Sequence, residues 1–62
     1  MPHVQITMLQ GRTLEQKRKL VRRITDALAE ECGARREAIS VAIVEVSKED
    51  FASNGMLVVD KK

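Results

Sequence analysis

Residues 39–46 constrain the fold of this chain more than any other feature. The run Ile-Ser-Val-Ala-Ile-Val-Glu-Val is rich in β-branched side chains and is apolar on nearly both faces. Such a run is typical of a strand that is buried on both sides, as the strands of parallel sheets are. We therefore expect a strand that needs a layer of protein against each of its faces.

The amino-terminal half of the chain predicts another strand and one long helix. Residues 3–9 alternate polar and apolar side chains, which predicts a strand with one apolar face. A capping-box pattern between Thr13 and Gln16 marks the start of a helix, and Gly33 is well placed to end it. Between these ends, apolar residues at helical spacing form one stripe: Leu14, Leu20, Val21, Ile24, Ala27, Leu28 and Cys32.

A strand, a helix and a strand in this order predict a right-handed β-α-β crossover. The expected fold class is α/β, with a single β-α-β unit of two parallel strands and one long helix. The apolar run 56–59, which follows Gly55, predicts a short C-terminal hairpin or arm. One helix covers only one face of the sheet, and a two-stranded sheet is not stable alone. We therefore expect the unit to be assembled as an oligomer.

Chain length and cysteine content favour the same conclusion. The 62 residues fit one domain, 1–62, and a chain of this size buries only about 60% of the surface that its unfolded form exposes. Small domains gain stability from disulfides, a metal or oligomerisation. Cys32 is the only cysteine and His3 the only histidine, so neither an intrachain disulfide nor a zinc-type metal site is expected. Oligomerisation is the remaining source of stability.

Composition also limits the expected partners. The net charge of +2 is too small to indicate nucleic acid by itself, and Phe51 is the only aromatic residue, which argues against base stacking. No apolar run approaches the length of about 18 residues that a membrane span requires. The first residues lack the pattern of a signal peptide. We expect no nucleic acid and no membrane partner, and a reducing, cytoplasmic location.

Conventional catalytic groups are not recognisable in the sequence. His3 falls on the polar face of the first strand, where a solvated or hydrogen-bonded side chain is expected. Cys32 lies on the apolar stripe, which favours a place in the core over a reactive thiolate. Glu45 is isolated in a strand, and the chain has no glycine-rich phosphate loop.

The basic residues favour two different interpretations. The run 17–23 could bind anions, but acidic residues flank it, which favours a solvated helix face. Arg12 lies in the short loop between the first strand and the helix, where open α/β units place ligand sites. It is either an exposed loop charge or a ligand contact, and the residues alone leave both interpretations open.

Pro2 is the most unusual candidate for chemistry. A methionine before a residue as small as proline is normally removed, and its removal would expose a secondary amine. An α-amino group has a reference pKa of about 7.7 to 8.0, close enough to neutrality to serve as a general base. The alternative is that the proline protects the amino terminus or fits the edge of a strand. Taken alone, Pro2 favours that alternative.

Together these features resemble the 4-oxalocrotonate tautomerase family over essentially the whole chain. The resemblance rests on Met1-Pro2, the alternating first strand, the segment from Leu9 to Lys17, the second strand ending in Glu45-Val46, and Phe51. A proline directly after the methionine and a later Gly-Arg-Thr-Leu-Glu-Gln-Lys segment form a fairly specific pair of signals. Neither signal is specific alone.

The resemblance implies a cofactor-free keto–enol isomerase that acts on unsaturated 2-hydroxy or 2-oxo acids such as 2-hydroxymuconate. Pro2 would be the general acid–base, Arg12 would bind a substrate carboxylate, and Phe51 would line a dry pocket. The resemblance also implies a hexamer built as a trimer of dimers, with each site formed by more than one subunit. A homo-oligomer is expected, and a hetero-oligomer is the alternative.

Ser40 is a departure from the family pattern. It stands where well-studied members carry a second arginine that contacts the 2-oxo or carboxylate end of the substrate. A serine can donate a hydrogen bond to a carbonyl but supplies no charge, so we expect weaker enolate stabilisation or a different preferred substrate. Arg35 and Arg36 lie just upstream and are candidates to replace the missing charge.

Three other functions remain as alternatives. A related proline-dependent hydratase, dehalogenase or decarboxylase would need a further carboxylate near the site. A weakly active or non-catalytic subunit of a mixed oligomer would take its missing groups from a partner. A ribbon-helix-helix DNA-binding dimer would require residues 39–46 to be helical, which their β-branched side chains disfavour.

Overall fold

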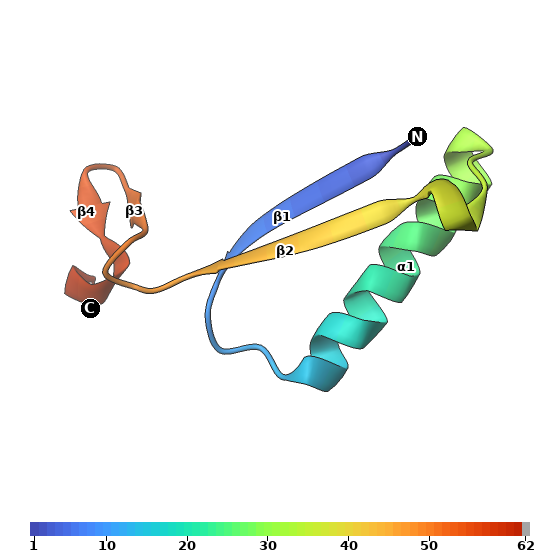
Figure 1. Cartoon of the computed structure of the whole chain (residues 1–62). Coiled ribbons are helices and arrows are strands. Elements are labelled where there is room, and N and C mark those ends of the chain that lie inside the picture. Colours follow the sequence, from blue (N-terminus) through green and yellow to red (C-terminus); the bar gives the residue numbers. More distant parts are fainter. Residues whose placement is uncertain (62) are drawn as a thin grey trace.

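The computed structural model describes residues 1–61, which form one strand-helix-strand unit and a small hairpin (Figure 1). Strand β1 spans His3–Leu9, helix α1 spans Leu14–Cys32 and strand β2 spans Ser40–Val46. The hairpin consists of β3 (Ala52–Ser53) and β4 (Met56–Leu57), and short 3₁₀ turns cover Arg36–Ala38 and Val58–Asp60. The β-α-β order, the single long helix and the C-terminal hairpin are confirmed.

Strands β1 and β2 pair in parallel over their whole length, from His3 opposite Ser40 to Leu9 opposite Val46. Paired residues share a face of the sheet because side chains alternate along each strand. The half-buried face lies against α1 and carries Val4, Ile6, Met8, Val41 and Ile43. The opposite face carries the exposed residues His3, Gln5, Thr7 and Val44. We call this second face the open face.

Helix α1 begins and ends where its capping residues predict. Thr13 Oγ1 accepts from the Gln16 backbone N–H at 3.1 Å, and Gln16 Oε1 accepts from the Thr13 N–H at 2.9 Å. Gly33 closes the helix with φ 67°, a left-handed conformation that a glycine adopts without strain. No helix within residues 1–61 is long and apolar enough to cross a membrane.

The prediction that Cys32 belongs to the core is wrong for this chain, in which the thiol is exposed. Leu14, at the other end of the same stripe, is 61% exposed. Both residues lie at ends of α1, and a sheet of only two strands is too narrow to cover the whole apolar stripe. The core therefore consists of the central part of the stripe against one face of the sheet.

One chain does not bury a complete core. No residue within 1–61 is fully buried, and Val44 on the open face is exposed. The chain exposes 5018 Å², which is about 1,000 Å² more than the roughly 4,000 Å² of a folded monomer of 7.0 kDa. That excess is close to the surface of about 800 Å² that each partner buries in a standard interface.

The hairpin extends away from the β-α-β unit as an arm (Figure 1). Asn54 and Gly55 both have positive φ, at 52° and 76°, as the tight turn of a two-residue hairpin loop requires. Strand β4 covers only the first half of the predicted run 56–59. The arm exposes four large apolar side chains, those of Phe51, Met56, Leu57 and Val59. It gives the chain an elongated shape of 42 × 24 × 14 Å.

Candidate active site

Pro2 lies directly before β1, where the second strand holds its backbone. The backbone N–H of Ser40 donates to the Pro2 carbonyl oxygen at 3.1 Å, so the first residue of β2 is fixed beside it. The parallel pairing places the amino ends of both strands together, and it brings Pro2 and Ser40 to the same end of the sheet. We call this the proline end.

His3 belongs to the same cluster. Its Nδ1 atom lies 2.6 Å from Ser40 Oγ, in a hydrogen bond between paired residues of the two strands. The expectation of a solvated or hydrogen-bonded histidine is confirmed, but the sequence did not indicate Ser40 as its partner. These two residues are separated by 37 positions, and only the strand register brings them together.

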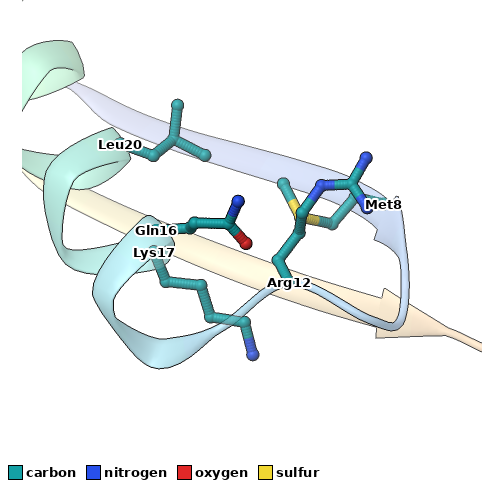
Figure 2. Close-up of a pocket in the computed structure, with 5 residues that line it drawn as sticks. All are labelled: Met8, Arg12, Gln16, Lys17 and Leu20. Carbon is teal, nitrogen blue, oxygen red and sulfur yellow. The ribbon is translucent and has the colours of Figure 1, made fainter.

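Arg12 lies at the opposite end of the sheet, after the last residue of β1. Gly11 has φ 124° and turns the chain toward α1 there. Arg12 lines an open hollow of about 220 Å³ together with Met8, Gln16, Lys17 and Leu20 (Figure 2). The hollow therefore joins the end of β1 to the first turns of α1.

Arg12 is the cation in this hollow that pairs with no carboxylate of residues 1–61. Lys17 Nζ lies 2.6 Å from Glu45 Oε1, and the two side chains are only 26% and 29% exposed. The Lys17 amino group points away from the Arg12 guanidinium (Figure 2). Arg12 takes part in none of the ion pairs within residues 1–61. A carboxylate that entered the hollow would meet Arg12 as its free counter-charge.

Arg35 and Arg36, the candidates to replace the missing charge, are already engaged in ion pairs. Arg35 pairs with Glu37 at 3.0 Å, and Arg36 pairs with Asp26 at 2.5 Å. Both could have supplied charge near Ser40, yet each is matched by a carboxylate within the chain. In the basic run 17–23, Arg18 pairs with Glu15 on the exposed helix surface, as a solvated face predicts, whereas Lys17 is half-buried against Glu45 of β2.

Phe51 occupies a third position, at the start of the arm. Its side chain is 41% exposed, and its backbone carbonyl accepts from the Val58 N–H at 2.8 Å. Arg12 and Phe51 follow the carboxyl ends of β1 and β2, whereas Pro2 and Ser40 lie at the proline end. From His3 to Leu9, β1 spans about 20 Å. One chain therefore divides the four candidate residues between two ends of its sheet.

The chain matches a family model described as "Tautomerase enzyme" over residues 2–61. It is 49% identical over 55 residues to 2-hydroxymuconate tautomerase of Bacillus subtilis (strain 168), and the match covers 89% of each chain. The family model spans every helix and strand described above.

Solved structures agree with the sequence relatives. A crystal structure of a homologue of 4-oxalocrotonate tautomerase superposes with a TM-score of 0.95 at 44% identity, covering 98% of this chain and 100% of that one. A heterohexamer 4-oxalocrotonate tautomerase from Chloroflexus aurantiacus superposes with a TM-score of 0.94 at 29% identity, covering all of both chains. The similarity therefore extends over the β-α-β unit and the arm.

Proposed function

The chain belongs to the tautomerase family, and from that premise we propose that it is a keto–enol tautomerase of unsaturated 2-hydroxy and 2-oxo acids, such as 2-hydroxymuconate. The observation that carries the proposal is the position of Pro2. It directly precedes β1 and is held by Ser40, in a chain that matches the family from residue 2 onward. The expected compartment is the reducing cytoplasm.

Pro2 would transfer the proton. After removal of Met1, its secondary amine takes the proton from the 2-hydroxyl group of the dienol and returns it to a carbon further along the conjugated chain. One O–H bond breaks and one C–H bond forms, so the reaction is an isomerisation that consumes no other reactant. General acid–base catalysis of this kind contributes about 10²- to 10⁴-fold to a rate.

Arg12, Phe51 and Ser40 would bind the substrate around this amine. The Arg12 guanidinium can hold a carboxylate with two parallel hydrogen bonds, which a lysine cannot do. Phe51 would form an apolar wall, and Ser40 would donate a hydrogen bond to a substrate oxygen. This set needs no cofactor and no metal.

Assembly would complete the site. Pro2 and Arg12 lie at opposite ends of one sheet, so a substrate a few ångströms long cannot reach both in one chain. The open face and the apolar arm supply surface for contacts between chains. We propose a homo-oligomer, built as a hexamer from three dimers, in which Pro2 of one chain meets Arg12 and Phe51 of others. A mixed oligomer is the alternative, as the heterohexameric relative illustrates.

Mass spectrometry of the intact chain and a Pro2→Ala variant test the acid–base role together. We expect the methionine to be absent, and we expect Pro2→Ala to lower kcat for ketonisation of 2-hydroxymuconate by at least about 100-fold. Size-exclusion chromatography should show the same assembly for both proteins. A retained methionine in an active enzyme would contradict the assignment, because Pro2 would then be an amide.

Expression of the chain alone separates the homo-oligomer from the mixed oligomer. A self-sufficient enzyme assembles and turns over substrate without any other chain. An assembled but inactive protein would favour the mixed oligomer, because its partner would supply the missing groups.

A further inference from the structure

We propose that His3 contacts the substrate, and that the His3–Ser40 pair donates a hydrogen bond to the 2-oxygen while Pro2 moves the proton. The inference rests on the proposed function and adds a residue to it. The group that the pair would bind is the 2-hydroxy or 2-oxo oxygen of the substrate, which becomes an enolate oxygen during the reaction.

The position of the pair beside Pro2 is fixed by the backbone. His3 follows Pro2 directly in the chain, and Ser40 is its register partner on β2. The Ser40 N–H also donates to the Pro2 carbonyl oxygen. Both His3 and Ser40 are exposed on the open face, which α1 does not cover. The pair is therefore held at the proline end and left exposed by its own chain, so it can line a site that neighbouring chains complete.

The pair keeps one donor free in either tautomer of the imidazole. If Ser40 donates to His3 Nδ1, the neutral ring carries its proton on Nε2, and that N–H is left to donate. If Nδ1 carries the proton and donates to Ser40 Oγ, the Ser40 hydroxyl hydrogen is left to donate. The hydrogen bond thus orients both side chains and leaves a directed donor in each case.

The 2-oxygen is the substrate atom that this donor suits. Pro2 takes its proton from the 2-hydroxyl, so that oxygen must lie close to the amine. When the O–H bond breaks, the electron pair stays on the dienolate and negative charge develops at the 2-oxygen. A fixed donor contributes most where charge develops during the reaction. The carboxylate is charged throughout, and Arg12 matches it with a permanent charge.

Kinetics of four variants test this role, with ketonisation of 2-hydroxymuconate as the assay. We expect His3→Ala and Ser40→Ala each to lower kcat by about 10- to 100-fold, somewhat less than the loss of an oxyanion-hole donor in a closed site. His3→Gln keeps an N–H donor and should recover part of the rate. Gln5→Ala is the matched control, because Gln5 shares the strand and face of His3 but forms none of the side-chain hydrogen bonds within residues 1–61.

The outcomes separate this inference from the proposed function. Wild-type turnover that depends on Pro2, combined with His3→Ala and Ser40→Ala rates equal to that of Gln5→Ala, would overturn the role of the pair alone. Wild-type protein without Pro2-dependent turnover would overturn both proposals. Size-exclusion chromatography must show the wild-type assembly for each variant that is compared.

A measurement on the wild-type protein covers the case in which a variant fails to assemble. His3 is the only histidine, so its imidazole proton signals in an NMR spectrum are unambiguous. The probes are 2-oxoadipate and adipate, two dicarboxylates that differ only in the 2-oxygen. At saturation we expect 2-oxoadipate to shift the imidazole signals and adipate to leave them nearly unchanged. Equal shifts with both probes, or no shift with bound 2-oxoadipate, would overturn the proposal.

Discussion

Arg12 is the residue whose surroundings most clearly suit it to bind an anion. It lines a hollow of about 220 Å³, and the neighbouring cation, Lys17, is matched by Glu45. The Arg12 side chain takes part in no ion pair within residues 1–61. At the scale of single residues, its free charge therefore distinguishes it from the arginines at positions 18, 35 and 36.

Replacing Arg12 should weaken substrate binding more than it slows chemistry. Hydrogen bonds to charged groups contribute about 1.5–3 kcal/mol, so we expect Arg12→Ala to lower kcat/KM by about 10- to 100-fold, mainly through KM. Arg12→Lys should recover only part of this, because an ammonium group lacks the planar fork. Arg22→Ala, on the exposed surface of α1, is the control. Equal kinetics for Arg12→Ala and Arg22→Ala would exclude the carboxylate role.

Ser40 provides a neutral hydroxyl group at the proline end. A serine donor is neutral, and hydrogen bonds to charged groups are roughly twice as strong as neutral ones. We therefore expect Ser40→Arg to raise kcat/KM for 2-hydroxymuconate by several-fold to about tenfold, although it removes the bond to His3. Steady-state kinetics at one ionic strength check this. If Ser40→Arg assembles normally and its kcat/KM does not rise, a missing positive charge at position 40 does not limit the reaction.

The residues of the site were predictable to different degrees. The family resemblance predicts four site residues, because each falls at a recognisable position along the chain: Pro2, Arg12, Ser40 and Phe51. The pairing of His3 with Ser40 was not predicted, because it depends on the register between two strands that are far apart in the sequence. Local patterns specify which face a residue occupies but not its neighbour on the next strand.

At the scale of elements, the Lys17–Glu45 ion pair connects the start of α1 to the end of β2. Its side chains are less exposed than those of the other three ion pairs within residues 1–61. Glu45 was predicted to be isolated in its strand, but α1 passes over that face and brings Lys17 to it. The pair therefore fixes the first turns of the helix, and with them the loop that carries Arg12.

A double-mutant cycle measures how strongly this pair couples the two elements. We expect Lys17→Met and Glu45→Gln each to lower the free energy of unfolding by about 1–2 kcal/mol, between the values of surface and buried pairs. The double variant should be less destabilised than the sum, with a coupling of about 1 kcal/mol. All proteins are compared at one chain concentration, because assembly contributes to stability.

The control for that cycle is the exposed pair Glu15–Arg18 on the same helix. Its side chains are 65% and 60% exposed, and exposed pairs of this spacing couple by about 0.2–0.5 kcal/mol. A coupling for Lys17 and Glu45 no larger than that of the control would contradict the positioning role.

The bounds of the strands and the helix were predicted more accurately than the exposure of their residues. The bounds of β1 and the two ends of α1 agree with alternation, the capping box and Gly33, because these signals are local. The exposure of Cys32 was not predicted, because it depends on how wide a sheet lies beneath the helix. The Asn54–Gly55 turn settles the arm as a hairpin, which the apolar run alone left open.

At the scale of the whole molecule, a single chain leaves apolar surface uncovered. It has an open sheet face, an exposed apolar arm and about 1,000 Å² of surface beyond that of a folded monomer of its mass. Contacts between chains can cover this surface. They can also complete the site, because they can bring together candidate residues that lie at two ends of one sheet.

A charge on the open face should prevent this assembly. Val44 is 40% exposed in one chain, and Val44→Asp would bury a carboxylate if a second chain covers the face. We expect the variant to elute as a smaller species in size-exclusion chromatography and to lose turnover. Arg22→Asp, on the exposed side of α1, should keep the wild-type assembly. Normal assembly of Val44→Asp would show that the open face is not an interface.

If Pro2 and Arg12 act on one substrate from different chains, mixing the subunits of two impaired variants should restore turnover. Pro2→Ala and Arg12→Ala are unfolded together in equal amounts and reassembled, and turnover is assayed well below the wild-type KM, where the loss of kcat in one variant and of substrate binding in the other both lower the rate. Random mixing should restore about a quarter of the sites, because such a site takes an intact Pro2 from one chain and an intact Arg12 from another. Turnover near a quarter of the wild-type value is the predicted result. If mass spectrometry shows that mixed oligomers form but their turnover stays as low as that of either variant alone, Pro2 and Arg12 do not act on one substrate from different chains.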